Sequence, residues 1–527
     1  MSGRRRRRPP LALAVLGALV GASALLPVVY LFVRSAGGAE AWELLASSRT
    51  LGILWRTLLI IATVTAFSAL VAVPMAWLSV RADIPGRRLI TIAAALPLVI
   101  PSFVMATTAI QLYGSRGVIQ GFLSPLGVER LPGIYGLGGA TLVLVLTTYP
   151  YIYLTVRGSL RRLDPSLEEA ARAMGYGAVR TFLFVTVPML KPAVAAGALL
   201  VALYTLSDFG AVALLRYQTF TAAIYLQYES SVNRALAAGL SMVLVVLAVA
   251  LLAGEGFTRG RARYHRSTAG AVREGRLVDM GPWKLPALGM AMMPIAAGLL
   301  MPVALLSYWL VRGLVNDQVM APLAAPVWNS VTVSLMAAGV TVAAAIPVAV
   351  LSVRYRSMWT RLLERVTYIG FGLPGVVVAL SLVFFGVNVA LFLYQTTWML
   401  VFAYMVLFLP AAMGAVRSSL LQVSPRVEEA AASLGRSPWQ VFSSVTFPLV
   451  MPGVLSGAAL VFLLTMKELP ATLILSPIGF KTLSTAIWSA ATEAFFARTA
   501  AASLLLIVVS GVPTAYFVLR RQERGSS

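Results

Sequence analysis

The stretch "TLLIIATVTAFSALVAVPMAWLSV", Thr57 to Val80, contains 24 residues without one charged side chain. About 18 such residues are enough to cross a bilayer as a helix. The apolar residues run on continuously, without the period-two alternation of a β-barrel strand. Because backbone polar groups in lipid must be satisfied within the segment, this stretch predicts a membrane-spanning helix.

Similar apolar segments recur along the whole chain. Of its 527 residues 59% are apolar and only 12% are charged, whereas a soluble domain carries about a quarter charged residues. The first segment is longer than the ~7–15 apolar residues of a signal peptide, so we expect it to be retained. The sequence thus predicts an all-α polytopic membrane protein with about twelve transmembrane helices, near residues 11–33, 55–80, 91–113, 136–156, 192–215, 232–253, 285–311, 328–353, 363–386, 394–416, 452–475 and 497–519.

The two halves of the chain repeat one another. Trp55, Pro74 and Arg81 recur 273 positions later as Trp328, Pro347 and Arg354. Further along the offset is 260, as in the pairs Arg157 with Arg417 and Pro188 with Pro448. We therefore predict a first repeat over 1–253, a basic linker over 254–284 and a second repeat over 285–527. Six spans in each repeat would insert both the same way up, as parallel repeats.

The distribution of the basic residues predicts the orientation. Of 42 Lys and Arg residues, 31 fall in the termini and the loops on the same side, 10 lie on the other side, and Lys467 lies within a span. The positive-inside rule then places both termini in the cytoplasm. The same rule explains the net charge of +23, so we expect no nucleic-acid partner. With no Cys and a single His, His265, disulfides and sites built from Cys or His clusters are excluded.

Two loops, 157–191 and 417–451, carry the same polar motif. The first contains "EEAARAMG" from Glu168 to Gly175, and the second contains "EEAAASLG" from Glu428 to Gly435. Each is preceded by a good N-cap and a proline for the first helical position, Asp164-Pro165 and Ser424-Pro425. The carboxylates near the first turn suit the helix dipole, and glycine suits a left-handed C-cap. Each loop therefore predicts a short capped helix.

These helices have two interpretations, an amphipathic connector on the lipid headgroups or a docking element for another protein. Recurrence of the caps, the Glu pair and the small Ala face favours docking. The motif also resembles the signature of ABC importer permeases, in which this loop is the coupling helix that binds the ATP-hydrolysing subunit. The resemblance implies coupling roles for Glu168, Glu169, Ala170, Ala171, Gly175, Glu428, Glu429, Ala430, Ala431 and Gly435.

The chain itself lacks a nucleotide-binding motif. A phosphate-binding loop needs Gly-Lys followed by Ser or Thr, and none of the four lysines follows a glycine. We therefore expect this chain to bind no cofactor, with ATP and Mg²⁺ on a separate pair of ATPase subunits. The resemblance also implies a bacterial cytoplasmic (inner) membrane location and an extracytoplasmic substrate-binding protein as partner.

A second repeated feature lies at the far ends of spans five and eleven. "LSDFGAVALL" (Leu206–Leu215) aligns with "MKELPATLIL" (Met466–Leu475), which sets Asp208 against Glu468, where Gly210 and Pro470 would loosen the helices. Ionisable residues at membrane depth usually face a cavity, although they can simply terminate or pair helices. Carboxylates would suit a hard trivalent cation or an organic cation. The candidate pathway residues are Ser207, Asp208, Thr219, Lys467, Glu468 and Thr482, with Asp208 and Glu468 as candidate metal ligands.

"SDFG" and "KELPATL" resemble the fused two-repeat permeases of ferric-iron importers, and the likeness extends over the whole chain. It implies alternating access driven by the ATPase, with ferric iron delivered by the binding protein. Related permeases for thiamine, polyamines or oxyanions share much of this architecture and remain alternatives. A twelve-helix secondary transporter is a further alternative, since "RADIPGRR" (Arg81–Arg88) faintly matches its loop after span two, but that fold does not predict the coupling loops. An embedded enzyme is disfavoured because no nucleophile–base set lies near a span.

Overall fold

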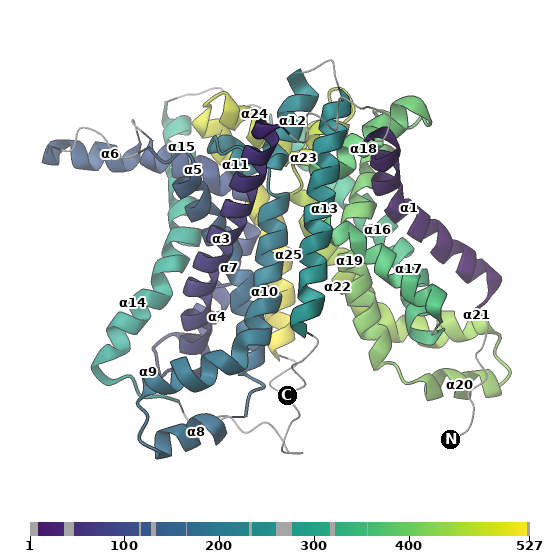
Figure 1. Ribbon diagram of the computed structural model, residues 1–527, viewed down its shortest axis with the longest axis horizontal. Coiled ribbons are helices and arrows are strands. Elements are labelled where there is room, and N and C mark those ends of the chain that lie inside the picture. Colours follow the sequence, from purple (N-terminus) through teal and green to yellow (C-terminus); the bar gives the residue numbers. More distant parts are fainter. Residues whose placement is uncertain are drawn as a thin grey trace. The chain divides into compact units, whose positions relative to one another are not determined.

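The computed structural model describes residues 9–35, 47–114, 117–127, 133–164, 166–230, 234–259, 277–316, 322–355 and 357–523. Pro165, His265 and most of the basic linker lie outside these ranges. The described residues are almost entirely helical, with one isolated bridge between Ala82 and Val278. Figure 1 shows the order of the helices along the chain. The all-α prediction is confirmed.

The helices match the predicted spans. Nine described helices are long and apolar enough to cross a membrane, and a bent pair, Arg87–Val99 with Ser102–Gly121, forms a further candidate. Two shorter apolar helices, Gly375–Asn388 and Phe496–Gly511, lie at the positions of the ninth and twelfth predicted spans. Each of the twelve predicted segments therefore corresponds to a helix or a helix pair.

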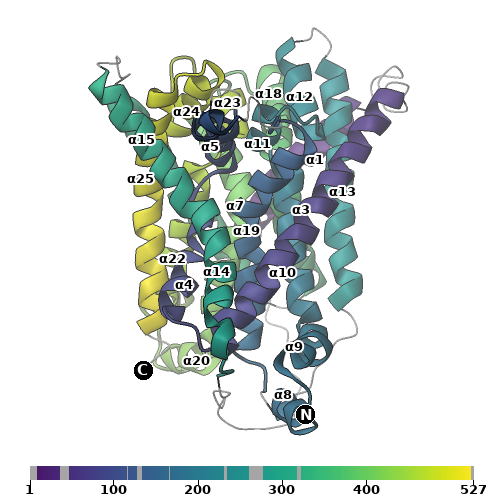
Figure 2. The same cartoon turned by 90° about the vertical axis from the view of Figure 1, so that its left-hand side faces the viewer.

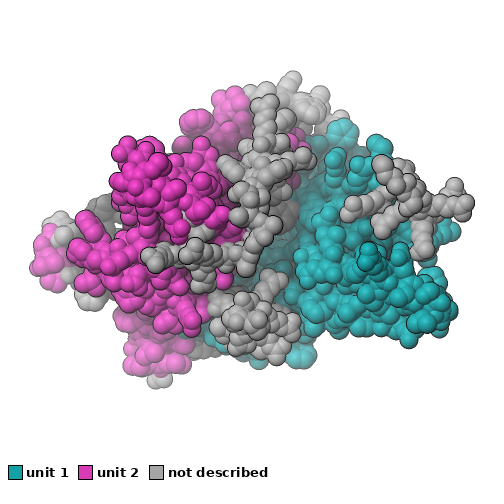
Figure 3. Space-filling model, turned by 90° about the horizontal axis from the view of Figure 1, so that it is seen from below, with its two compact units in different colours: residues 1–46, 224–245, 319–527 teal, residues 47–223, 246–318 magenta. Residues whose placement is uncertain are grey.

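The chain forms two compact units. Unit 1 comprises residues 1–46, 224–245 and 319–527, and unit 2 comprises residues 47–223 and 246–318 (Figure 3). The units do not coincide with the two sequence repeats, because residues 1–46 and 224–245 of the first repeat group with the second, and residues 285–318 of the second repeat group with the first. The boundaries at 253 and 285 stay predictions drawn from the sequence.

Three helices form the core of unit 2: α3 (Ser48–Arg81), α7 (Leu137–Leu160) and α10 (Val187–Ser207), which pack pairwise against one another. Small and hydroxyl side chains allow close packing, as between Ser68 of α3 and Thr148 of α7, whose hydroxyl oxygens lie 3.2 Å apart. Gly197 brings α10 onto α7, since a Cβ there would lie 2.7 Å from the Cα of Ile152. The opposite face of α3 exposes Trp55 and Leu70, as expected of a surface that contacts lipid.

Unit 1 has the equivalent core, built from α16 (Ala324–Arg354), α19 (Thr397–Gln422) and α22 (Phe447–Met466). In each unit a short helix that follows the first core helix packs against a shorter helix that follows the last core helix. These pairs are α5 (Ser102–Tyr113) with α11 (Gly210–Leu214), and α18 (Gly375–Asn388) with α23 (Pro470–Leu475). The remaining helices after the cores are α12 (Phe220–Ser230), α13 (Arg234–Arg259), α24 (Leu483–Thr492) and α25 (Phe496–Glu523).

The first helices of the two repeats are exchanged. Helix α1 (Leu11–Ser35) packs against α16, α17 (Met358–Ile369) and α18 of the second repeat. The hydroxyl of Ser381 in α18 donates to the carbonyl of Pro27 in α1 at 2.9 Å. Conversely, α14 (Lys284–Ile295) and α15 (Met301–Val315) pack along α3, α4 (Arg87–Ala93) and α5 of the first repeat (Figure 2).

Four predicted spans are interrupted in the structure. The third bends by 96° between α4 and α5, and the ninth breaks before α18. Pro97 and Pro101 cause the first break and Pro374 the second, because proline removes a helix hydrogen bond and clashes with the preceding turn. The fifth and eleventh end at Ser207 and Met466, so the interruption predicted near Gly210 and Pro470 is confirmed.

Candidate functional site: the repeated loop helices

The predicted loop helices form in both repeats. Helix α8 spans Ser166–Ala173 and α20 spans Pro425–Ser433. The Asp164 carboxylate accepts a hydrogen bond from the Ser166 amide at 3.0 Å, and the Ser424 hydroxyl accepts one from the Arg426 amide at 3.4 Å. Pro425 occupies the first helical position. The predicted N-caps are therefore confirmed, whereas Pro165 lies outside the described residues.

Both helices end at the predicted glycine. Gly175 has φ of +90° and Gly435 has φ of +83°, in the left-handed region where an L side chain is strained. In the first loop the Tyr176 amide donates back to the Ala171 carbonyl at 3.1 Å, which closes the helix end. A Cβ at either glycine would meet no atom within 4 Å. The requirement for glycine there is conformational rather than steric.

The first glutamate of each pair points into the protein. Glu168 is only 5% exposed, and its carboxylate lies 3.3 Å from the Arg81 guanidinium at the end of α3. It also accepts a 3.0 Å hydrogen bond from the Thr186 hydroxyl. Arg81 additionally donates to the carbonyl of Leu163 at 3.3 Å, just before the loop helix. The ion pair fixes α8 to α3, and the hydrogen bond fixes it to the segment that leads into α10.

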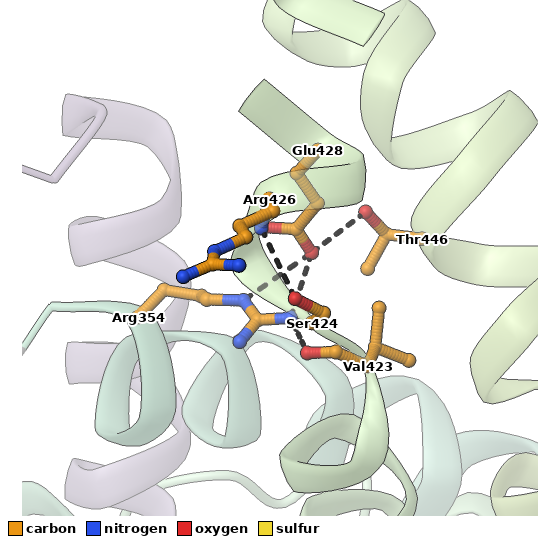
Figure 4. A network of polar contacts seen from close by, with 6 residues as sticks. All are labelled: Arg354, Val423, Ser424, Arg426, Glu428 and Thr446. Carbon is orange, nitrogen blue, oxygen red and sulfur yellow. Dashed lines mark hydrogen bonds and ion pairs between the residues drawn. The ribbon is translucent and has the colours of Figure 1, made fainter. Parts of the chain in front are cut away.

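Glu428 makes the same contacts in the second repeat. Its carboxylate lies 2.8 Å from the Arg354 guanidinium and accepts from the Thr446 hydroxyl at 3.0 Å. Arg354 also donates to the carbonyl of Val423 at 3.1 Å. Figure 4 shows how Arg354 and Thr446 approach the Glu428 carboxylate from opposite sides. We call each such set the Arg–Glu–Thr network: Arg81, Glu168 and Thr186, and Arg354, Glu428 and Thr446.

A widened turn places the threonine of each network. Phe182–Thr186 and Phe442–Thr446 are π-helical segments that lead into α10 and α22. Such turns are rare and are frequent at functional sites. One extra residue in the turn shifts the helical register, and each threonine at the end of its segment donates to the glutamate. The π segment recurs at the same place in both repeats, so it is part of the structure that the repeats share around each Arg–Glu–Thr network.

The outer face of each loop helix remains exposed and partly apolar. Glu169, Ala170, Glu429 and Ala430 are exposed, whereas Ala171 and Ala431 are buried against the protein. Three exposed apolar positions recur at an offset of 260 residues. These are Leu167 with Val427, Met174 with Leu434, and Val179 with Trp439, all between 46% and 83% exposed. We call this set the apolar docking face.

Asp208 follows the last residue of α10 and is buried. One carboxylate oxygen accepts from the Ala211 amide at 3.0 Å and from the Val212 amide at 3.3 Å, which caps α11. The other oxygen accepts from the Ser102 hydroxyl at the start of α5. The Thr221 hydroxyl donates to the Asp208 backbone carbonyl at 2.6 Å. Asp208 thus joins three segments of unit 2.

Glu468 holds the corresponding place in unit 1. It is half-buried, and one carboxylate oxygen accepts from the Ala471 amide at 3.1 Å, at the start of α23. The Thr472 hydroxyl donates to the Glu468 backbone carbonyl at 2.7 Å. Position 375, the counterpart of Ser102, is glycine, and the Glu468 carboxylate lies against it. Both carboxylates therefore cap the helix that follows them.

The other candidate pathway residues lie close to these caps. Ser207 donates to the Leu203 carbonyl at 2.8 Å, and the Thr219 hydroxyl lies 2.9 Å from that of Thr221. Thr482 caps α24 through the Thr485 amide at 3.3 Å, and Lys467 is half-buried. Within the described part of the chain, no group of three acidic, His or Cys side chains forms a metal-binding cluster. The pathway role stays a prediction.

Comparison with known proteins agrees with the repeated site. A family described as "binding-protein-dependent transport system inner membrane component" matches the chain twice, over residues 65–254 and 336–524. The chain belongs to this family. It is a permease with two fused repeats, and each matched region contains one loop helix with its Arg–Glu–Thr network.

Several permeases are similar to this chain. The Fe(3+)-transport system permease protein FbpB 2 of Haemophilus influenzae is 36% identical over 98% of this chain and 99% of its own length. The ferric transport system permease protein FbpB of Actinobacillus pleuropneumoniae is 23% identical over 79% of this chain and 64% of its own. The molybdenum transport system permease protein ModB of Escherichia coli (strain K12) is 29% identical over 39% of this chain and 93% of its own.

The sequence interpretation of the permease missed the Arg–Glu–Thr network. It treated both glutamates of each pair alike, and it used Arg81 and Arg354 only as a matched pair of the repeat and as loop charges. The signal was nevertheless present, since the arginine, the first glutamate and the threonine all recur between the repeats. Glu169 and Glu429 are exposed, whereas Glu168 and Glu428 hold the loop helix in place.

Proposed function

We propose that the chain is the membrane subunit of an ATP-driven importer for ferric iron that works by alternating access in a bacterial cytoplasmic membrane. The observation that carries this proposal is the pair of loop helices, each fixed by an Arg–Glu–Thr network and each presenting the apolar docking face. A rigid helix can transmit the displacement of a bound partner to the membrane spans. The Arg–Glu–Thr network links α8 to α3 and to the segment before α10, and it links α20 to α16 and to the segment before α22.

The partners follow from the same geometry. Exposed Met174, Val179, Leu434 and Trp439 suit apolar clefts on two copies of an ATPase subunit in the cytoplasm. Both chain termini would lie on that side, as the excess of basic residues indicates. ATP and Mg²⁺ would be bound by those subunits. A substrate-binding protein outside the membrane would deliver the ion.

The proposal of ferric iron rests on relatives that are named for Fe(3+) or ferric transport, of which the Haemophilus influenzae protein is matched over 99% of its own length. Hard carboxylate oxygens at Asp208 and Glu468 would suit a trivalent cation entering or leaving the pathway. Their capping bonds use part of their acceptor capacity, and a carboxylate has about four lone-pair sites, so further contacts remain chemically available. An oxyanion is the second candidate, since the molybdenum permease matches one repeat over nearly its whole length.

The test is reconstitution into vesicles with the ATPase and the binding protein. We expect the chain alone to hydrolyse no ATP and the complete system to take up ⁵⁵Fe(III) only when ATP is present. Met174→Ser with Leu434→Ser should weaken ATPase binding by about tenfold or more, because exposed apolar anchors dominate such interfaces. Uptake of molybdate in place of iron would refute the substrate, and uptake without any ATPase would refute the coupling mechanism.

A further inference from the structure

The second repeat contains a cavity close to its Arg–Glu–Thr network. The cavity has a volume of about 370 Å³ and is lined by Ser352, Val353, Arg361, Glu364, Arg417 and Leu421. Arg417 of α19 forms an ion pair with Glu364 of α17, with a distance of 3.1 Å between Nε and Oε1. The two arginines and one glutamate give this lining a formal charge of +1.

The first repeat has the same positions with a different charge. At the repeat offsets of 273 and 260 residues, the counterparts of the lining are Ser79, Val80, Arg88, Thr91, Arg157 and Arg161. Thr91 replaces the glutamate, and Arg161 replaces the leucine. The formal charge at these positions is therefore +3, and Arg87 adds a further cation where the second repeat has Thr360.

Arg157 lacks the counter-charge that its counterpart Arg417 has. The buried Nε of each arginine makes no hydrogen bond, but Arg417 has its ion pair with Glu364, and Arg157 has no such ion pair among the described residues. Arg161 and Arg87 act on it as like charges. Among the described residues no carboxylate lies within ion-pair distance of Arg87, Arg88, Arg157 or Arg161, since the nearby Glu168 is paired with Arg81. A partly buried cation in this position is costly unless an anion balances it.

The surroundings indicate where the anion comes from. Arg157 lies near the end of α7, a helix apolar enough to span the membrane, and Arg161 follows that helix. Arg88 is exposed on α4, and its neighbour Leu89 is 73% exposed. Basic pockets between transmembrane helices near the membrane surface bind the headgroups of anionic lipids, and an exposed leucine beside them can contact an acyl chain. A soluble inorganic anion would make no apolar contact with that leucine.

We propose that Arg87, Arg88, Arg157 and Arg161 form a binding site for the phosphate of an anionic phospholipid, and that only the first repeat carries it. In the second repeat Glu364 occupies the role of the lipid phosphate by neutralising Arg417. The site is independent of the transported substrate, and it makes the two otherwise similar repeats unequal in their dependence on the membrane.

Native mass spectrometry of the delipidated full-length permease tests the site by titration with phosphatidylglycerol or with zwitterionic phosphatidylcholine. We expect one tightly retained phosphatidylglycerol and no comparable retention of phosphatidylcholine. Arg161→Gln should weaken the retention by about fivefold, the effect of one basic residue at a lipid surface, and Arg157→Gln by more. Arg161 is exposed, so its variant keeps the test valid even if Arg157→Gln fails to fold.

Two matched variants of the second repeat serve as control and as gain of function. Arg361→Gln, at the counterpart of Arg88, should leave phosphatidylglycerol retention unchanged. Glu364→Gln frees Arg417 and should add a second retained lipid. Equal retention by wild type and Arg161→Gln, or no gain in Glu364→Gln, would overturn the proposal. Competition by inorganic phosphate at equal affinity would show a site for a soluble anion, and loss of the lipid on adding the ATPase would show a site for a partner's carboxylate; either would also overturn it.

Discussion

The carboxylate of Glu468 occupies the space that a side chain at position 375 would fill, because Gly375 has no Cβ. In the other repeat, Ser102 stands at that position and donates its hydroxyl to the shorter carboxylate of Asp208. The longer acid faces a glycine, and the shorter acid faces a serine. The two pairs are alternative solutions to one packing requirement, the cap of the short helix that follows.

Gly375→Ala should therefore lower the apparent melting temperature of the purified permease. The new Cβ displaces the Glu468 carboxylate and breaks its bond from the Ala471 amide, and leaving that buried amide without a partner costs about 1–3 kcal/mol. Adding Glu468→Asp should recover part of the loss, because the shorter acid withdraws from position 375. Gly339→Ala is the control, since a Cβ there meets no atom within 4 Å. Purely additive effects of the two changes would contradict this account.

Arg81→Gln should destabilise the protein more than Arg354→Gln does. The side chains of Arg81 and Glu168 are 7% and 6% exposed, whereas those of Arg354 and Glu428 are 15% and 19% exposed. Removing one partner of a buried ion pair costs about 3–5 kcal/mol, because the other charge is left unpaired. The double variant Arg81→Met with Glu168→Gln should regain much of the lost stability in thermal melts. Equal losses for Arg81→Gln and Arg354→Gln would argue against burial as the cause.

Gly175→Ala and Gly435→Ala should weaken the association with the ATPase while membrane insertion stays intact. Each residue has a positive φ, which costs an L-residue about 1 kcal/mol or more, so the end of the loop helix shifts and displaces the neighbouring Met174 or Leu434. Co-purification of the tagged ATPase with the permease measures the effect. Gly177→Ala is the control within the same loop, because Gly177 has an ordinary φ of −64°.

Asp208→Asn and Glu468→Gln separate helix capping from charge. An amide oxygen can still accept the bonds from the Ala211 and Ala471 amides, so the caps should survive. If the carboxylates contact a cation in the pathway, uptake by the double amide variant should fall by at least tenfold at unchanged melting temperature. The corresponding double alanine variant should lose both uptake and stability. Normal uptake by the amide variant would leave these residues with a purely structural role.

The sequence alone was enough to predict the spans, the repeat and the capped loop helices. Uncharged length identifies a span, and Ser424, Pro425 and Gly435 act through local backbone preferences that the structure confirms. The broken third span was predicted as a single span over 91–113, although the sequence contains Pro97 and Pro101. In a membrane a proline inside an apolar run is often tolerated, so its presence does not decide between a kink and a break.

Contacts between distant segments could not be predicted in the same way. The sequence shows that Arg81, Glu168 and Thr186 recur, but it does not show that they meet, because their contact depends on the packing of α3 against α7 and α10. Placement of α1 on α16, α17 and α18 is even less visible, since apolar helices carry few side chains that specify a neighbour. Recurrence at the two offsets was the best available signal, but recurrence alone does not show that Arg81, Glu168 and Thr186 are in contact.

The exchange of α1 and α14–α15 has a consequence for biosynthesis. During synthesis α1 enters the membrane long before α16, α17 and α18 have been made. Until then, the face of α1 that packs against these helices stays uncovered. The bundle of the first repeat is likewise incomplete until α14 and α15 emerge. We expect that neither half can complete its fold alone, so a chain terminated between them would give an incomplete bundle instead of one working half.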